Sequence, residues 1–205
     1  MRKTLRLAWA LAAAAMLAAN PTPSVAGKFH LFSSSKPKVS RSQPLPRPGP
    51  QPVPYRWTQG AAPQAHKDMV ATFNKIGLAP GQYVLSQTIP TEGETHIIVD
   101  LQTQMAYVYR ADKLVGASTI STAKHGMVTP LGFWSVLEKH KSYRSKKYEN
   151  ASMPFMQRID DYGIAFHGGN NPGYPASHGC IRLPMKFAAR LFDLTKVGSK
   201  VIIEG

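Results

Sequence analysis

Cys180 is the only cysteine of the 205-residue chain, and a histidine and an arginine lie within two residues of it. A second histidine, His167, stands thirteen positions earlier. The segment around the thiol reads Ser177-His178-Gly179-Cys180-Ile181-Arg182. A single thiol cannot form an internal disulfide, so reactivity explains its surroundings better than cross-linking does. We therefore predict that Cys180 is a nucleophile.

A thiol with a pKa near 8.5 is mostly protonated at neutral pH, so a nucleophilic cysteine needs a base or a positive field within reach. His178, His167 and the start of a helix expected near Pro184 are the candidates. On an extended segment His178 is poorly angled toward Cys180, whereas His167 arrives from a separate strand and can be held opposite the sulfur. We predict His167 as the general base. Gly179 has no β-carbon, which suits main-chain N–H donation to a developing oxyanion.

Two other interpretations of this cluster stay open. Cys180 could be a small buried apolar residue beside ordinary loop histidines, although the polar, glycine-rich stretches 168–173 and 177–179 are not typical of a core. Zinc ligation by His167, His178 and Cys180 is disfavoured, because a His-x-Cys pair lacks the usual spacer and no fourth ligand stands nearby. We predict no metal.

Residues 1–26 carry the pattern of a secretory signal peptide. A basic start is followed by an apolar run from Leu7 to Ala19 and by a small-x-small cleavage site that ends at Ala26. The pattern predicts an exported protein of the periplasm or cell envelope. The run is shorter than the roughly 20 residues of a membrane span, so we expect no stable span, with an uncleaved anchor as the alternative.

Residues 27–66 hold six basic residues and no acidic one, in a chain of net charge +14. Proline occupies every second position from Pro44 to Pro54, which favours an extended polyproline II spacer. We interpret 27–66 as a basic, proline-rich linker that adheres to an anionic polymer or to lipid head groups. Nucleic acid is not expected as a partner, because an exported protein rarely meets it, and a merely solvated linker is the alternative.

The remainder divides into a short helical lead-in, 67–94, and a domain, 95–205. In the lead-in, helical spacing begins near His66 and a C-cap is expected at Gly77; the apolar positions are Met69, Val70, Phe73 and Ile76. In the domain we expect strands at 97–101, 105–109, 114–121, 133–137, 163–166 and 201–203. The strand at 163–166 would deliver His167 at its end. One helix should open at Pro184, with a shared apolar face of Phe187, Ala188, Leu191 and Leu194. The fold class is mainly β, with a helix beside the candidate site.

The stretch from Thr95 to Glu204 resembles the catalytic domain of the L,D-transpeptidases, the YkuD or ErfK/YbiS/YcfS/YnhG family. Its hallmark is a histidine followed by glycine, and then Ser/Thr-His-Gly-Cys with Arg or Asn two residues later. Here these are His167-Gly168 and 177–182, and three accessory stretches match in order: 97–101, 121–132 and 153–155. The resemblance implies a mixed β-sandwich with a helix after the nucleophile loop.

The resemblance also implies a reaction. Cys180 would attack the carbonyl of the third residue, usually diaminopimelate, of a peptidoglycan tetrapeptide. D-Ala would leave, and the rest of the peptide would remain on Cys180 as a thioester. The acyl acceptor would be an amine of another stem peptide (a 3-3 crosslink), a lipoprotein lysine or a free D-amino acid. No cofactor is needed, and we expect a monomer. Two alternatives are a periplasmic L,D-carboxypeptidase or amidase and a non-catalytic wall-binding protein.

The family lends roles to the neighbouring residues. Ser177 and His178 would shape the oxyanion and substrate site together with Gly168 and Gly179, and Arg182 would hold the loop or a substrate carboxylate. The interval from His167 to Cys180 is shorter than in many relatives. Upstream, five cations crowd nine positions, and we predict that they orient donor carboxylates, with solvated surface as the alternative: Lys139, Lys141, Arg144, Lys146 and Lys147.

Overall fold

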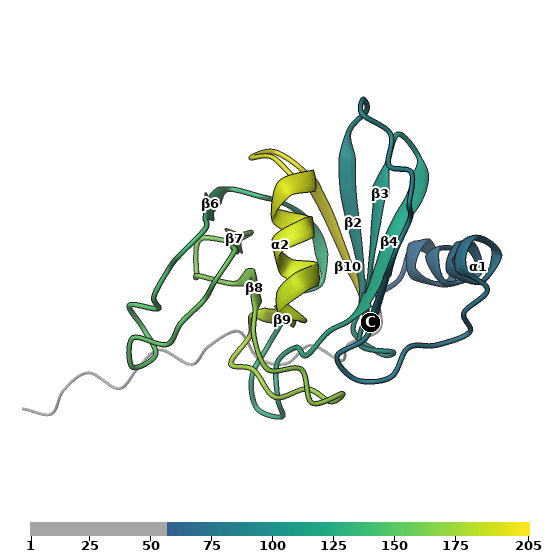
Figure 1. The fold of residues 1–205 in the computed structure, drawn as a ribbon. Coiled ribbons are helices and arrows are strands. Elements are labelled where there is room, and N and C mark those ends of the chain that lie inside the picture. The colour runs from purple at the N-terminus through teal and green to yellow at the C-terminus, as the bar shows by residue number, and fades with distance from the viewer. Residues whose placement is uncertain (1–56) are drawn as a thin grey trace, which may run out of the picture. The chain divides into compact units, whose positions relative to one another are not determined.

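The computed structural model describes residues 57–205 (Figure 1). The predicted signal peptide, 1–26, and the linker up to residue 56 lie outside the described residues. The described part contains two β-sheets and two helices, which confirms the mainly β class and the mixed sandwich.

The larger sheet has six strands in the order β1-β4-β3-β2-β10-β5. Their bounds are β1 Tyr83–Leu85, β2 Thr95–Asp100, β3 Met105–Arg110, β4 Lys113–Thr119, β5 Gly132–Ser135 and β10 Lys200–Glu204. The strands expected at 97–101 and 105–109 form a hairpin, because β2 pairs antiparallel with β3 from Thr95↔Arg110 to Asp100↔Met105. β10 inserts between β2, to which it is parallel, and β5, to which it is antiparallel. Strands β2 to β4 are apolar on both faces because both faces are covered.

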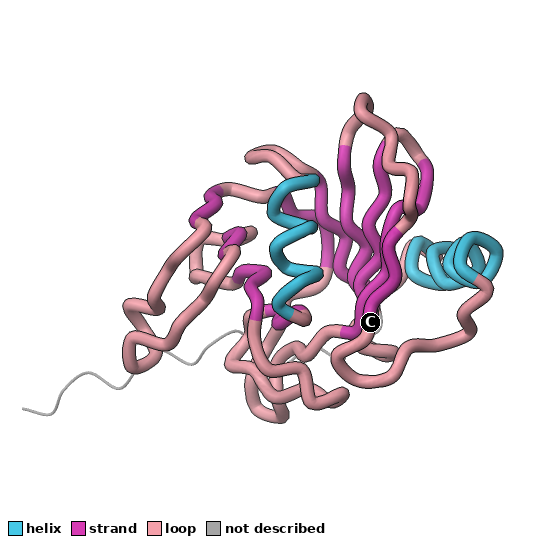
Figure 2. The backbone as a smooth tube through the Cα atoms, viewed as in Figure 1, coloured by secondary structure: helices cyan, strands magenta, loops and turns pink. Residues whose placement is uncertain are grey.

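Helix α2, Met185–Leu194, lies between the larger sheet and the smaller one (Figures 1 and 2). The smaller sheet has the order β6-β7-β8-β9, with bounds β6 Glu138–His140, β7 Met156–Arg158, β8 Ala165–Gly168 and β9 Ile181–Leu183. The helix buries Phe187, Ala188 and Leu191 in a single core that takes side chains from both sheets. The predicted helix after Pro184 is therefore present, and it packs directly behind β8.

Helix α1, Ala61–Phe73, covers the other face of the larger sheet (Figure 1). It begins earlier than the expected start near His66, because its first N–H groups bind a carboxylate from β10. Glu204 accepts hydrogen bonds from the backbone N–H groups of Gln59, Ala61 and Ala62 at 2.7 to 3.2 Å. No pattern within the helix encodes such a cap.

The end of α1 also differs from the prediction. Asn74 terminates the helix in the left-handed conformation, with φ 51°, and donates its N–H to the carbonyl of Val70. The expected cap at Gly77 is thus wrong, and Ile76, which is 82% exposed, does not belong to the helical face. Asparagine tolerates positive φ better than most side chains, which explains why the helix stops there.

Four strands were not predicted, namely β1, β6, β7 and β9. Each is three residues long, so its sequence shows too little alternation to be recognised. The strand expected at 163–166 lies two residues later, and His167 is therefore inside β8 rather than after it. Among the helices of residues 57–205, neither is long and apolar enough to cross a membrane.

Candidate active site

His167 lies on the face of the smaller sheet that points away from α2. Its neighbour Phe166 is buried in the core beside that helix, and alternate residues of a strand point to opposite faces. β8 and β9 run parallel with His167 paired to Arg182. Cys180, two residues before Arg182, therefore shares the face of His167. The sheet thus brings together the two residues predicted as nucleophile and base.

The tautomer of His167 follows from its hydrogen bond. Its Nδ1 lies 2.9 Å from the backbone carbonyl oxygen of Gly168, and a carbonyl can only accept, so Nδ1 carries the proton. Nε2 of the neutral ring then holds a free lone pair. The side chain is 8% exposed, and this burial lowers the pKa of His167; the bond to Gly168 opposes the shift, and the charge of Arg182 adds to it. Burial therefore favours the neutral imidazole, whose Nε2 can accept a proton.

Cys180 directly precedes β9 and packs in a small apolar cluster with Met153, Met156, Ala165 and Tyr143. Burial raises the pKa of its thiol. The N–H of Ala165 and the charges of Arg182 and Lys147 act in the opposite sense, while Asp160 raises the pKa further. The Sγ atom lies 3.6 Å from the carbonyl oxygen of Gly163. Burial therefore favours the neutral thiol, as it favours the neutral imidazole of His167.

Ser177 braces the turn before the nucleophile. Its hydroxyl donates to the carbonyl of Cys180 at 2.6 Å and accepts the N–H of Gly179 at 3.0 Å. Gly179 has φ +135°, and a β-carbon there would lie 2.5 Å from Cδ1 of Ile164 and 2.9 Å from the carbonyl oxygen of Val128. Glycine is required here for both conformation and space. The N–H of Gly179 binds Ser177, so it is not one of the main-chain donors available to an oxyanion.

The accessory stretch 121–132 supports the same turn. Thr129 donates its hydroxyl to the carbonyl of Gly179 at 2.7 Å and accepts the N–H of Ala123 at 3.1 Å. Ser177 donates its N–H to the carbonyl of Thr122 at 2.9 Å. The nucleophile turn is consequently held by a hydroxyl and by a backbone hydrogen bond, neither of which depends on substrate.

Gly168 and Arg182 both contribute to the backbone packing around the site. A β-carbon at Gly168 would lie 2.8 Å from Sδ of Met185, so glycine here lets α2 approach β8, and the residue's carbonyl orients His167. Arg182 exchanges two backbone hydrogen bonds of 3.0 Å with Ser121, so its main chain braces the site. Its guanidinium has no hydrogen bond or ion pair within residues 57–205. The aliphatic Cγ and Cδ of Arg182 lie near Gly169, as does Cε1 of His167.

His178 is exposed and takes no part in the thiol–imidazole face. Its ring stacks on the ring of Tyr148, with centroids 4.6 Å apart and an angle of 16° between the ring planes. Tyr148 belongs to residues 141–155, between β6 and β7, which we call the flap. Because Met153 of the flap also packs with Cys180, the flap lies over the face that carries the thiol.

One member of the predicted cation cluster is not part of this flap surface. Lys139 donates hydrogen bonds from Nζ to the carbonyls of Phe192 and Thr195, at the C-terminal end of α2. Its ammonium also lies 4.3 Å from the centroid of the Phe192 ring. Lys139 therefore caps a helix, since cations are favoured at a C-terminus. The prediction that it orients a donor carboxylate is wrong.

Asp160 is a site residue that the sequence analysis missed. Its carboxylate is buried and accepts the N–H groups of Tyr162 and Ile164 at 3.0 and 2.7 Å. These bonds shape the turn that presents the Gly163 carbonyl to Cys180 and packs Ile164 against Gly179. The sequence signal was the Asp-Asp-Tyr-Gly turn before β8, which is typical of an aspartate binding its own backbone.

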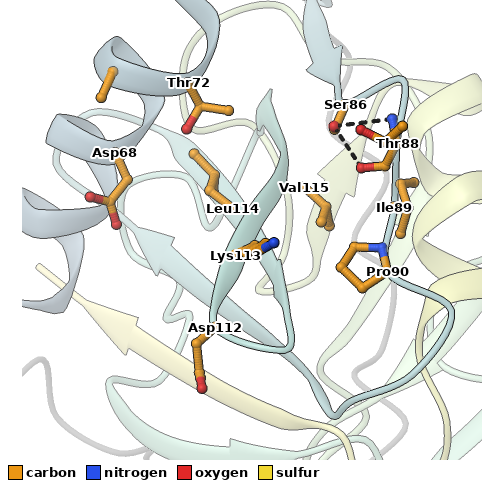
Figure 3. Close-up of a pocket in the computed structure, with 11 residues that line it drawn as sticks. Asp68, Thr72, Ser86, Thr88, Ile89, Pro90, Asp112, Lys113, Leu114 and Val115 are labelled. Carbon is orange, nitrogen blue, oxygen red and sulfur yellow. Dashed lines mark hydrogen bonds between the residues drawn. The ribbon is translucent and has the colours of Figure 1, made fainter.

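Within residues 57–205 no candidate metal centre lies on this face, and a groove elsewhere in the fold is separate from it. Within residues 57–205 no three His, Cys, Asp or Glu side chains are grouped to hold a metal ion. A groove of about 690 Å³ opens between α1 and the start of β4 (Figure 3). It is lined by Asp68 and Thr72 of the helix, by Asp112 and Lys113, and by residues 86–90. It contains none of the predicted site residues.

The catalytic-domain model of the YkuD L,D-transpeptidases matches residues 94–203. The chain belongs to this family, which confirms the resemblance read from the motif. The family consists of acyltransferases that act on peptidoglycan peptides. YqjB of Bacillus subtilis (strain 168), which is named as a candidate L,D-transpeptidase, is 31% identical over 131 residues, covering 56% of this chain and 73% of YqjB.

Solved structures show the same fold. An L,D-transpeptidase from Mycobacterium smegmatis has a TM-score of 0.51 and 20% identity, covering 55% of this chain and 59% of that one. One from Stackebrandtia nassauensis has a TM-score of 0.51 and 22% identity, covering 69% and 64%. The match thus spans less than two thirds of the length of either solved chain.

Proposed function

We propose that this protein is a peptidoglycan L,D-transpeptidase whose nucleophile is Cys180 and whose general base is His167. The observation that carries the proposal is the shared sheet face: the half-buried thiol of Cys180 lies one strand away from the buried imidazole of His167. Nδ1 of that imidazole is hydrogen-bonded to a carbonyl, so Nε2 is left to accept a proton. That is the arrangement nucleophilic catalysis by cysteine requires.

The proposed acylation step begins with transfer of the thiol proton from Cys180 to Nε2 of His167. The sulfur forms a bond to the carbonyl carbon of the third stem residue, usually diaminopimelate, in a tetrapeptide donor. The bond to the D-Ala nitrogen then breaks, and His167 returns the proton to that nitrogen. A thioester and free D-Ala result. The energy of the cleaved amide stays in the thioester, so no cofactor is consumed.

Deacylation would run the same proton transfer with a second nucleophile. An acceptor amine attacks the thioester carbonyl, loses its proton to His167, and releases the sulfur, which regains the proton. The amine belongs to another stem peptide, which gives a 3-3 crosslink, to a lipoprotein lysine or to a D-amino acid. Water in the same position would make the protein an L,D-carboxypeptidase, which is the second candidate. Both reactions share the acyl-enzyme.

The environment of the protein is part of the proposal. Export to the periplasm or cell envelope is supported by the signal pattern of residues 1–26, and wall binding by the acid-free, basic arm of residues 27–66. A wall-bound enzyme needs no nucleic-acid partner and no second subunit. We expect it to act as a monomer.

The test is mass spectrometry of the mature protein incubated with a purified disaccharide-tetrapeptide. We expect an adduct on Cys180 with loss of D-Ala, and then crosslinked dimers or a D-amino-acid exchange product. Cys180→Ala should abolish the adduct, and His167→Ala should slow its formation at least about 10²-fold, the scale of general acid/base catalysis. An adduct in Cys180→Ala would refute the nucleophile, and tripeptide as the sole product would identify the carboxypeptidase.

A further inference from the structure

The flap is braced by its own backbone. The N–H of Met153 donates to the carbonyl of Tyr143, and the N–H of Ser145 donates to that of Ala151, both at 2.9 Å. Gly168 of β8 donates its N–H to the carbonyl of Pro154 at 2.8 Å, which ties the base of the flap to the strand that carries His167. The flap thus has a defined conformation above the thiol.

The tip of the flap is shaped by a buried serine. The hydroxyl oxygen of Ser145 accepts the N–H groups of Lys147 and Tyr148 at 3.3 and 3.1 Å. The chain then reverses through Glu149 and Asn150, which have φ of 44° and 56°. These contacts hold the ring of Tyr148 where it meets His178, so the tip is positioned by the protein itself.

Lys147 is attached to this pair of rings. Its Nζ lies 5.6 Å from the centroid of the Tyr148 ring, within the range of a cation–π contact. Burial raises the pKa of Cys180, and the charge of Lys147 is among the smaller effects that oppose this shift. The ammonium is thus within electrostatic reach of the sulfur. Lys147 is exposed and forms no ion pair with a carboxylate of residues 57–205. It is a cation held near the nucleophile without an anionic partner in the described fold.

We propose that Lys147, held on the Tyr148–His178 ring pair, is a specificity-determining residue that binds a carboxylate of the donor peptide while its third residue lies at Cys180. This inference rests on the proposed function, and it narrows the predicted cation cluster to one member. Stem peptides carry free carboxylates on D-Glu and on diaminopimelate. An ammonium with three donors suits such a group without demanding one orientation.

The other cations of the cluster do not contact the Tyr148–His178 ring pair. Lys139 caps α2, and Arg144 donates to the carbonyl of Asn150 within the flap. Lys146 is exposed next to Lys147 but has no hydrogen bond, ion pair or ring contact with residues 57–205. Lys146 is therefore the matched control, with the same charge in the same flap.

The experiment compares acylation by two donors. One is the tetrapeptide with free D-Glu and diaminopimelate carboxylates, and the other is the same peptide with both converted to carboxamides. For Lys147→Gln we expect KM for the acidic donor to rise by about three- to fivefold, the scale of an exposed charge pair, and to stay unchanged for the amidated donor. Lys146→Gln should match the wild type with both donors.

The two donors separate recognition from a change at the sulfur. Removal of the Lys147 charge also raises the pKa of Cys180, but that effect would slow both donors by the same factor. The inference would be overturned if Lys147→Gln raised KM equally for both donors, or if Lys146→Gln raised KM for the acidic donor as much as Lys147→Gln does. If the wild type forms no acyl-enzyme with either donor, the proposed function fails as well, and the two failures are thereby distinguished.

A second pair of variants tests the ring platform. Tyr148→Phe keeps the ring and should retain the preference for the acidic donor. Tyr148→Leu removes the ring and should lose the preference to the same extent as Lys147→Gln. Retention of the full preference in Tyr148→Leu, with the thermal unfolding midpoint unchanged, would contradict the role given to the stack.

Discussion

The hydroxyl of Ser177 donates to the carbonyl of Cys180 with 2.6 Å between the two oxygens, and it closes a small ring by accepting the N–H of Gly179. The serine thereby determines the backbone conformation of the nucleophile turn from a buried position. It touches neither the sulfur nor the imidazole. Its role is to position Cys180, and measurements of acylation rate and of stability can distinguish this role from a purely structural one.

Ser177→Ala should slow acylation by about 10-fold or more, because positioning errors at a nucleophile are costly. It should also destabilise the fold by about 1–3 kcal/mol, since two buried polar groups lose their partner. The control is Ser118→Ala in β4, where an equally buried hydroxyl donates to the carbonyl of Thr119 at 2.9 Å. We expect both variants to lose a similar amount of stability, and we expect slower acylation only in Ser177→Ala. Equal acylation rates in both variants would contradict positioning.

The pH dependence of Cys180 alkylation should reveal a neutral thiol–imidazole pair. Burial raises the pKa of Cys180, so the rate with iodoacetamide should climb with pH through a midpoint above the ordinary value of about 8.5. Burial lowers the pKa of His167, so acylation by a peptide donor should persist below about pH 6.5 before the base is protonated. Fast alkylation that is constant between pH 5 and 7 would indicate a preformed thiolate–imidazolium pair instead.

Glu204 should couple the stability of α1 to pH. Burial raises the pKa of Glu204, but its hydrogen bonds from Ala62, Gln59, Ala61 and Thr58 outweigh burial, and the net shift is downward. Because the folded pKa is depressed, the contribution to stability is present above the ordinary glutamate pKa of about 4.3 and is lost as pH falls through the folded value. Glu204→Gln should therefore cost about 1–2 kcal/mol at pH 7 and much less at pH 3.

The matched control for this cap is Glu94→Gln. Glu94 pairs with Lys200 at 3.6 Å through side chains that are 74% and 75% exposed. Such a surface pair contributes roughly 0–1 kcal/mol. Denaturant unfolding at pH 7 and pH 3 distinguishes the two variants, and an equal, pH-independent loss in both would contradict the cap.

Lys139→Met should destabilise the protein and spare its chemistry. The substitution removes two hydrogen bonds to the carbonyls of Phe192 and Thr195 while keeping an apolar stem beside the Phe192 ring. We expect a loss of about 1–2 kcal/mol, measured by urea unfolding, with KM for the acidic donor unchanged. Lys141→Met, at an exposed position of the flap, should change stability by less than about 0.5 kcal/mol. A raised KM in Lys139→Met would restore it to the carboxylate-binding cluster.

The sequence predicted the elements whose pattern of apolar residues agrees with their burial in the folded protein. Strands β2, β3 and β4 and helix α2 are long enough to show their pattern, and both histidines and the thiol stood out by chemistry alone. The three-residue strands could not be recognised, because each is defined by its neighbour in the sheet. The start of α1 was misplaced for the same reason, since its cap comes from Glu204, more than 140 positions away.

The candidate site shows the same division. The motif predicted Cys180 and His167 as site residues. The hydrogen bond from the N–H of Gly179 to Ser177 and the capping of α2 by Lys139 could not be predicted, because they join atoms that meet only after folding. The pairing of Tyr148 with His178 joins a flap and a turn that no sequence period links. The sequence thus predicted which residues form the site, but not how side chains from distant segments contact one another.

The insertion of β10 between β2 and β5 imposes an order on folding. β2 ends at Asp100 and β10 begins at Lys200, so one edge of β2 stays unpaired until all intervening residues have been synthesised. During that time the nascent chain exposes strand edges that can pair with other chains, which is a recognised route to aggregation.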